Sequence, residues 1–294
     1  MQGTAPTAQW VKRYPVFWIN LKGEPKRRRR MKAALTEGGW NHSLWNATDG
    51  RDPRHHFYAS ARPWQRATLL PGLERDNEAE PQRHTNRMEL ACLCSWQRLI
   101  ESLAQHHSHS GWFLLLEDDV GSSLAVPEHW PCSLNDIVEQ AGEKALAIQL
   151  APINAGVRRT LYERWQGRNG KDLVVPKADV RSHGNGAVLL HRNAVPLLRR
   201  RIGRWLEQWI PELHLLGHPR NVRPVADKWL YASLPPDSCY VSTFPLFCLE
   251  AETSSLHQDH VTSFHQASRH LTLELWREGR HQALLDAHAA WKKG

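Results

Sequence analysis

Three consecutive carboxylates, Glu117, Asp118 and Asp119, follow the apolar residues 113–116. Like charges this close repel one another unless a cation lies between them. Side chains two residues apart on a strand share a side, so we expect Glu117 and Asp119 to point together and Asp118 to point away. Two such carboxylates are ligands that Mn²⁺ or Mg²⁺ accepts. The segment predicts a divalent-metal site; the plainer alternative is an acidic turn that solvates the strand end.

The hydrophobic pattern predicts the elements that position these carboxylates. Short apolar runs predict strands, at 16–19, 44–47, 113–116, 145–150 and 187–190. Longer amphipathic runs predict helices, at 25–35, 88–103, 194–209 and 271–291, the last of them interrupted by Gly279. Strands that alternate with helices indicate the α/β class. The polar residues 51–85 predict a long irregular excursion between the second strand and the second helix.

Composition favours a globular protein over a membrane-spanning, secreted or disulfide-rich one. The chain has 294 residues, 41% of them hydrophobic, which is ordinary for a globular protein. It contains no apolar run long enough to cross a bilayer and no secretory signal at its start, so we expect a cytoplasmic protein. Its five cysteines form no CxxC pair, which favours reduced thiols over disulfides or a zinc ribbon. The net charge of +8 favours anionic partners.

Several sequence blocks, taken together, resemble glycosyltransferase family 25, which includes lipooligosaccharide and collagen hydroxylysine galactosyltransferases. They occur in the family's order over roughly residues 14 to 255. The blocks are PVFWINLKGEPKRRRRM (15–31), WNATDGRDP (45–53), ELACLCSWQRLIESL (89–103), LLLEDDV (114–120), GNGAVLLHRNAVPLL (184–198) and PVADKWL (224–230).

The resemblance implies a fold and an activity. The expected fold is of the GT-A type, a mainly parallel twisted sheet with helices on both faces. Residues 1–13 would be an extension, 14–263 the glycosyltransferase domain, and 264–294 a C-terminal helical segment of that domain. The implied activity is inverting, Mn²⁺- or Mg²⁺-dependent transfer of a hexose, with galactose favoured, from a UDP-sugar. The acceptor would be a saccharide or glycolipid of a surface glycan such as lipopolysaccharide. The protein would also make peripheral contact with an anionic membrane.

The resemblance also implies roles for individual residues. Glu117 and Asp119 would hold the metal, and ten residues would bind the donor: Asn20, Arg27, Arg28, Asp49, Gly50, Glu89, Ser95, Asp118, Gly184 and Gly186. Each has a plainer alternative. The basic run 26–30 is also typical of a solvated helix face, and a helix can aim only part of it one way, so we expect one arginine to face the donor. The Asp-Gly pair is also a turn signal, Glu89 also suits a helix start, and glycines also suit a tight strand entry.

Asp227 is the candidate general base, because an inverting transfer needs a carboxylate that takes the proton of the acceptor hydroxyl. Lys228 would keep it ionised and Trp229 would form the floor for a sugar ring. The alternative is that Asp227 caps a helix that begins near Lys228. Most of the 18 histidines are expected to be surface residues; the alternative for His257, His260 and His265, downstream of the resemblance, is that one of them adds an imidazole to the metal site.

Departures from the family's pattern keep other functions open. The Ser-His pair of the family is Ser95-Trp96 here, Val188 replaces an aromatic residue, and Ala226 separates Val225 from Asp227. One rival function is a divalent-metal phosphoesterase or nuclease, which would share the carboxylates and the basic charge. The other is a non-catalytic anion-binding protein. Nucleic acid is not an expected partner under the favoured interpretation.

Overall fold

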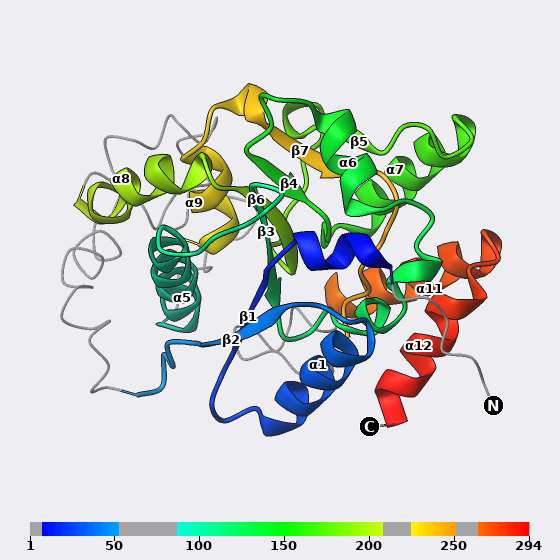
Figure 1. Ribbon diagram of the computed structural model, residues 1–294, viewed down its shortest axis with the longest axis horizontal. Coiled ribbons are helices and arrows are strands. Elements are labelled where there is room, and N and C mark those ends of the chain that lie inside the picture. The colour runs from blue at the N-terminus through cyan, green and yellow to red at the C-terminus, as the bar shows by residue number, and fades with distance from the viewer. Residues whose placement is uncertain (1–7, 53–86, 208–224, 251–263, 294) are drawn as a thin grey trace, which may run out of the picture. The chain divides into compact units, whose positions relative to one another are not determined.

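The computed structural model describes residues 8–52, 87–207, 225–250 and 264–293 (Figure 1). The chain divides into two compact units. The first comprises Met1–Trp45, His107–Arg192 and Asp237–Gly294. The second comprises Asn46–His106 and Asn193–Pro236. None of the helices within the described ranges is both long and apolar enough to cross a membrane.

A seven-stranded sheet forms the centre of the first unit. Its strands lie in the order β2 (His42–Asn46), β1 (Val16–Asn20), β3 (Trp112–Glu117), β6 (Ala187–His191), β4 (Ala147–Gln149), β7 (Cys239–Ser242) and β5 (Val174–Pro176). β1 is parallel to β3, and β4 is parallel to β7. β6 is antiparallel to both β3 and β4, and β5 is antiparallel to β7. Strands β1, β3, β4 and β7 therefore share one direction, which confirms the mixed α/β, mainly parallel prediction.

Both faces of this sheet are buried. On one face, Trp18 of β1 and Leu114 of β3 belong to the main hydrophobic core with Met31 and Leu35 of α1 (Pro25–Glu37). The side chains that alternate with them are equally buried; they include Phe17, Phe113, Leu115 and Val188. Strands buried on both faces read as continuous apolar runs, which is why 113–116 was recognisable as a central strand.

The helices of the first unit begin and end at local signals. Pro25 is at the first position of α1, where its missing N–H removes no hydrogen bond. α6 (Leu134–Ala141) begins with a capping box between Ser133 and Asp136. The other helices of this unit are α7 (Ala155–Gly167), α11 (Gln266–Glu278) and α12 (Gln282–Lys293). Short 3-10 helices complete it, at Gln9–Arg13, Ser122–Ala125 (η2), Pro127–His129, Lys177–Asp179 and Pro236–Ser238.

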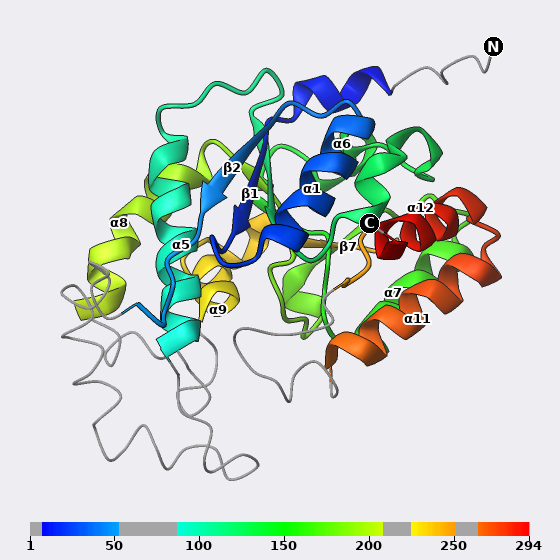
Figure 2. The same cartoon turned by 90° about the horizontal axis from the view of Figure 1, so that it is seen from below.

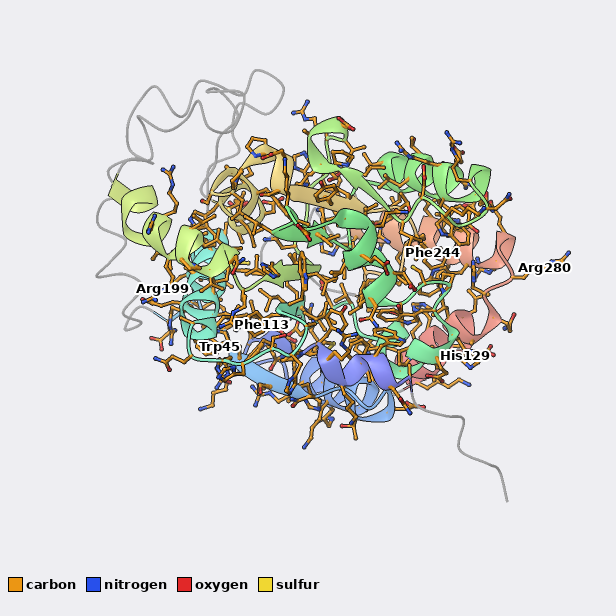
Figure 3. All side chains as sticks on the ribbon, turned by 45° about the horizontal axis from the view of Figure 1, so that its top comes forward. Trp45, Phe113, His129, Arg199, Phe244 and Arg280 are labelled. Carbon is orange, nitrogen blue, oxygen red and sulfur yellow. The ribbon has the colours of Figure 1, made fainter. Side chains whose placement is uncertain are left out.

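The C-terminal helices return to the N-terminal part of the chain. α12 lies beside α1 in both ribbon views, and Arg30 of α1 donates a hydrogen bond to the carbonyl oxygen of Lys292 at 3.2 Å (Figures 1 and 2). The predicted interruption at Gly279 is confirmed, because α11 ends there and α12 starts at Gln282. Arg280, in the turn between the helices, has a left-handed φ of 58° and points outward (Figure 3).

The second unit contains three described helices. α5 (Arg87–Leu103) packs against α8 (Ala194–Glu207) and α9 (Ala226–Ala232). α5 and the start of α8 match their predicted positions, and the predicted last residues of α8 lie outside the described ranges. The five cysteines all lie in the described ranges, and no disulfide joins any of them there.

Candidate functional site

Polar residues follow β1 and β3 where these neighbouring parallel strands end. The register places Ile19 of β1 opposite Glu117, the last residue of β3. Asn20 is the last residue of β1, and Asp118 and Asp119 follow β3 directly. The carboxyl ends of parallel strands are where α/β folds bind ligands. The sheet therefore brings the first and the acidic blocks of the sequence to one edge.

Asp118 is held by a hydrogen-bonded network at this edge. Asn20 Nδ2 donates to Asp118 Oδ2 at 2.6 Å, and an Arg27 guanidinium nitrogen donates to Asp118 Oδ1 at 3.1 Å. Arg28 Nε donates to Asn20 Oδ1 at 2.9 Å. Two arginines of the basic run reach this network, rather than the single one expected, because both lie in the first turn of α1 beside the strand ends. Arg29 is exposed.

Burial and charge oppose each other in this network. Burial, together with the neighbouring Asp119, raises the pKa of Asp118 to about 6, although Arg27 favours the ionised carboxylate and opposes this shift. For Arg27, burial lowers the pKa, but attraction to Asp118 and Asp119 outweighs it and the pKa is raised overall. Asp118 is thus bound by the protein's own amide and guanidinium groups.

Asp119 has a different environment. Its side chain is buried, and its Oδ1 has no hydrogen-bond partner among the described residues. A buried carboxylate oxygen without a partner is costly, and a cation removes that cost. The residue therefore fits a divalent metal. Glu117 is partly buried, and its backbone N–H donates to the Gly186 carbonyl oxygen at 2.9 Å.

Gly184 and Gly186 have reasons within the fold for being glycine. Gly184 has a φ of 97°, a conformation that favours glycine. A Cβ at Gly186 would lie 2.8 Å from Val120 Cγ1, so a larger residue would push against the segment that follows the carboxylates. These packing roles stand beside the donor-binding roles that the resemblance implies.

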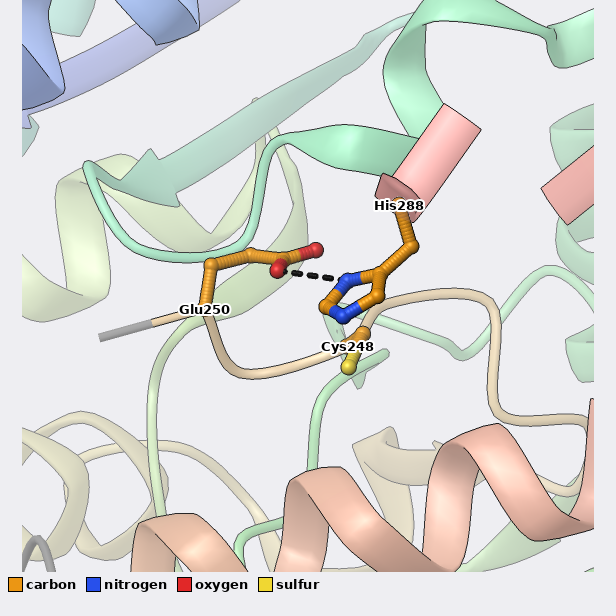
Figure 4. Close-up of side chains that lie close together, drawn as sticks. All are labelled: Cys248, Glu250 and His288. Atoms are coloured by element: carbon orange, nitrogen blue, oxygen red, sulfur yellow. Dashed lines mark ion pairs between the residues drawn. The ribbon is translucent and has the colours of Figure 1, made fainter. Parts of the chain in front are cut away.

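A second cluster of potential metal ligands is connected to Asp119 by a backbone hydrogen bond. The backbone N–H of Glu250 donates to the Asp119 carbonyl oxygen at 2.5 Å. The Glu250 side chain points toward Cys248 and His288, and all three are buried (Figure 4). Within the described ranges, this is the one group of three or more such side chains close enough to share a metal ion, and it does not include Glu117 or Asp119.

Sequence reasoning missed this cluster. Cys248 and Glu250 are two residues apart, but His288 is 38 residues after Glu250. No local spacing therefore indicates that the three could bind one metal ion. The available signal was a histidine on the buried face of α12. Of the histidines considered for the metal, His257 and His260 lie outside the described residues, and His265, which directly precedes α11, is not in the cluster.

Residues 49–52 form a turn in the second unit, in which the Asp52 backbone N–H donates to the Asp49 carbonyl oxygen at 3.2 Å. Asp49 Oδ1 accepts the backbone N–H of Arg51 at 2.9 Å, and the Arg51 guanidinium pairs with the same carboxylate at 2.8 Å. Ser95 Oγ, on α5, accepts the Thr48 backbone N–H at 2.8 Å and donates to the Ala91 carbonyl oxygen. Ser95 therefore anchors the turn that contains Asp49 and the buried Gly50. Glu89 is also buried, in the first turn of α5.

Asp227 lies in the first turn of α9. The helix begins at Ala226 with Val225 at the N-cap, so the alternative that Asp227 is itself the N-cap of a helix beginning near Lys228 is wrong. Its Oδ1 nevertheless accepts the Lys228 backbone N–H at 2.8 Å. Trp229 is fully buried and cannot be the floor for a sugar ring in this structure. Asp227 and Trp229 lie in the same turn of α9, and this turn directs the Trp229 side chain into the interior.

Two of the departures from the family's pattern are core residues. Trp96, on α5, and Val188, on β6, are both completely buried. Each fills hydrophobic interior, so their types are explained by packing.

Comparisons with known proteins do not identify a family for this chain. No family model matches the chain, and no curated protein matches it. Among solved structures, it is similar to the crystal structure of mouse xyloside xylosyltransferase 1 in its apo form. The identity is 12%, the match covers 78% of this chain and 84% of that one, and the TM-score is 0.34. A score this low carries no argument, so membership of family 25 stays a resemblance.

Proposed function

We propose that the chain is a divalent-metal-dependent glycosyltransferase that moves a hexose, with galactose favoured, from a UDP-sugar to a saccharide acceptor. One observation carries the proposal. At the carboxyl ends of β1 and β3, one carboxylate, Asp118, is neutralised by Arg27, while the next, Asp119, has a buried oxygen that no residue in the described ranges satisfies. A nucleotide diphosphate needs both cationic neighbours and a metal, and this edge offers the residues for both.

The metal would be held by Glu117 and Asp119. The fit rests on the orphaned oxygen of Asp119 and on an oxygen donor set, which Mn²⁺ and Mg²⁺ prefer. When bound, such an ion neutralises negative charge on a departing diphosphate. Arg27 and Arg28, already fixed by Asp118 and Asn20, would place positive charge beside the donor without first having to be ordered.

Asp227 would act as the base in this reaction. Its carboxylate would take the proton of the acceptor hydroxyl, whose oxygen forms the new bond to the anomeric carbon as the bond to UDP breaks. An inverting displacement of this kind needs one base and no covalent sugar–enzyme intermediate.

The resemblance also assigns donor binding to six further residues: Asp49, Gly50, Glu89, Ser95, Gly184 and Gly186. The acceptor, a saccharide or glycolipid of a surface glycan, and action at the cytoplasmic face of an anionic membrane rest on family resemblance alone.

Calorimetry with UDP tests the proposal. We expect UDP to bind the purified protein with Mn²⁺ and to lose at least tenfold in affinity with EDTA. Asp119→Asn should lose the Mn²⁺ effect, while the exposed control Asp179→Asn should keep it. A phosphoesterase or nuclease would instead hydrolyse phosphate esters without needing a UDP-sugar. An anion-binding protein would bind nucleic acid in a salt-sensitive, metal-independent way. Either result would refute the proposal.

A further inference from the structure

Three side chains with metal-binding atoms converge in the interior of the first unit. Cys248 and Glu250 lie in the segment that follows β7, and His288 lies on α12. Their exposed fractions are 0%, 6% and 6%. One ligand atom from each lies within 4.8 Å of the others, and Figure 4 shows the Glu250 carboxylate directed at the His288 imidazole with Cys248 close by. Thiol, carboxylate and imidazole therefore share one buried space.

The polar atoms of this cluster lack ordinary partners. Within the described residues, neither carboxylate oxygen of Glu250 and neither ring nitrogen of His288 has a hydrogen bond. His288 Nδ1 does lie 2.7 Å from Glu250 Oε2, so the two groups are in electrostatic contact without the alignment of a hydrogen bond. Buried polar groups in this state destabilise a fold unless something else satisfies them. A shared cation would satisfy the carboxylate and the imidazole together.

We propose that Cys248, Glu250 and His288 bind a Zn²⁺ ion at a site distinct from the donor metal. Zinc accepts thiolate, imidazole and carboxylate ligands at about 2.0–2.3 Å, which places their atoms roughly 3–4 Å apart in a tetrahedron. The observed spread is compatible with this arrangement after small side-chain shifts. Mn²⁺ and Mg²⁺ prefer oxygen, so the thiol distinguishes this site from the carboxylates after β3.

Charge and coordination number agree with zinc. The thiolate and the carboxylate together carry two negative charges, which balance the ion, and the imidazole binds in its neutral form. Three protein ligands leave the fourth tetrahedral position to water. With the ion bound, Glu250 and His288 would each coordinate it in place of their present close contact.

A metal here would connect two parts of the unit. His288 belongs to α12, whereas the backbone N–H of Glu250 is bonded to the carbonyl oxygen of Asp119. The ion would therefore fasten the C-terminal helix to the segment that supports the acidic residues. α12 also packs against η2, which follows those residues in the chain. The proposed role is to join these two segments, and it does not depend on the proposed transferase activity.

Titration of metal-free protein with Co²⁺ tests the site, because a cobalt–thiolate bond gives an ultraviolet charge-transfer band. We expect one Co²⁺ per chain with this band, its displacement by Zn²⁺, and a higher melting temperature with Zn²⁺ than without metal. Cys248→Ser should lose the band, and His288→Gln should weaken cobalt binding at least tenfold. Cys132→Ser, at another buried free thiol, should behave as wild type.

The wild-type titration keeps the proposal falsifiable even where a variant does not fold. A wild-type protein that gives no thiolate band overturns it, as does a folded Cys248→Ser protein that retains the band. Asp119→Asn should keep the band while it loses metal-dependent UDP binding, so failure of one proposal is distinguishable from failure of the other.

Discussion

Asp118 and Asp119 are adjacent in the chain, yet their surroundings differ in kind. Asp118 is bonded by Asn20 and Arg27, so its charge is balanced inside the protein. Asp119 has a buried oxygen that no described residue satisfies. Both residues lie in the turn that directly follows β3, where their side chains meet different neighbours. A carboxylate that organises the site and one that binds a ligand can therefore occupy consecutive positions.

Asp227→Asn separates a catalytic carboxylate from a structural one. Asparagine can still accept the Lys228 backbone N–H through its side-chain oxygen, so the melting temperature should change by no more than a few degrees. It cannot take a proton from an acceptor hydroxyl, so kcat should fall by at least 10²-fold with UDP-sugar binding unchanged. Turnover assays with calorimetry measure both quantities. Retained turnover would leave Asp227 with its helical contact alone.

Gly121 determines how closely the segment after the carboxylates approaches two helices. A Cβ there would lie 2.2 Å from Trp291 of α12 and 2.4 Å from Met31 Sδ of α1. Gly121→Ala should therefore lower the free energy of unfolding by about 1–3 kcal/mol, the usual cost of overpacking a core. Gly156→Ala, on α7 with no atom within 4 Å of the added Cβ, should raise it by about 0.5–1 kcal/mol. Chemical denaturation measures both; equal effects would contradict the packing argument.

The turn between α11 and α12 introduces a pH-dependent contribution to stability. His281 lies against Phe244, with ring centroids 4.8 Å apart, and burial lowers its pKa. A lowered folded-state pKa means that its stabilisation is present above the unfolded value of about 6.5 and is lost as pH falls through the folded value. His281→Gln should thus make the free energy of unfolding fall less steeply between about pH 7 and pH 5.

Denaturant unfolding at several pH values measures this slope. His270→Gln, at an exposed position on α11, is the matched control and should leave the slope as in wild type. If His281→Gln leaves the slope unchanged while the control alters it, the burial of His281 is not the cause.

Local signals explain which elements could be predicted from the sequence. α1 has Pro25 at its start and Gly38 after its end, and the apolar run of β3 is buried on both faces. Strands β5 and β7 were not predicted, because three- and four-residue strands are set by their neighbours in the sheet. α6 and α7 were also missed. Within α7, the fully buried Arg158 donates hydrogen bonds to the carbonyl oxygens of Pro152 and Phe247, a tertiary arrangement that no local pattern contains.

The residues of the candidate site also fall into those that the sequence could predict and those that it could not. Asn20, Arg27 and Asp118 could be brought together from the sequence, because they end or follow elements whose order places them at one edge. The set of Cys248, Glu250 and His288 could not, because it depends on α12 returning to the segment after β7. Site residues at strand ends are thus predictable from topology, whereas those contributed by a returning helix are not.

At the scale of the whole molecule, the net charge of +8 and the acidic edge have opposite signs. A positive molecule attracts diphosphates and anionic surfaces, and the metal proposed at its few clustered carboxylates would make that edge attractive to them as well. A UDP-sugar is the ligand class that would use both the metal and the basic residues.

A screen of UDP-sugars for metal-dependent release of UDP tests the central claim most directly. With purified protein and Mn²⁺, we predict UDP release from one UDP-hexose above all others, UDP-galactose first, and a rise in rate with a saccharide acceptor. EDTA and Asp119→Asn should each reduce the rate by at least 10²-fold, and Asp179→Asn should not. The account is contradicted if every UDP-sugar stays intact with Mn²⁺ while the folded protein hydrolyses simple phosphate esters or nucleic acid.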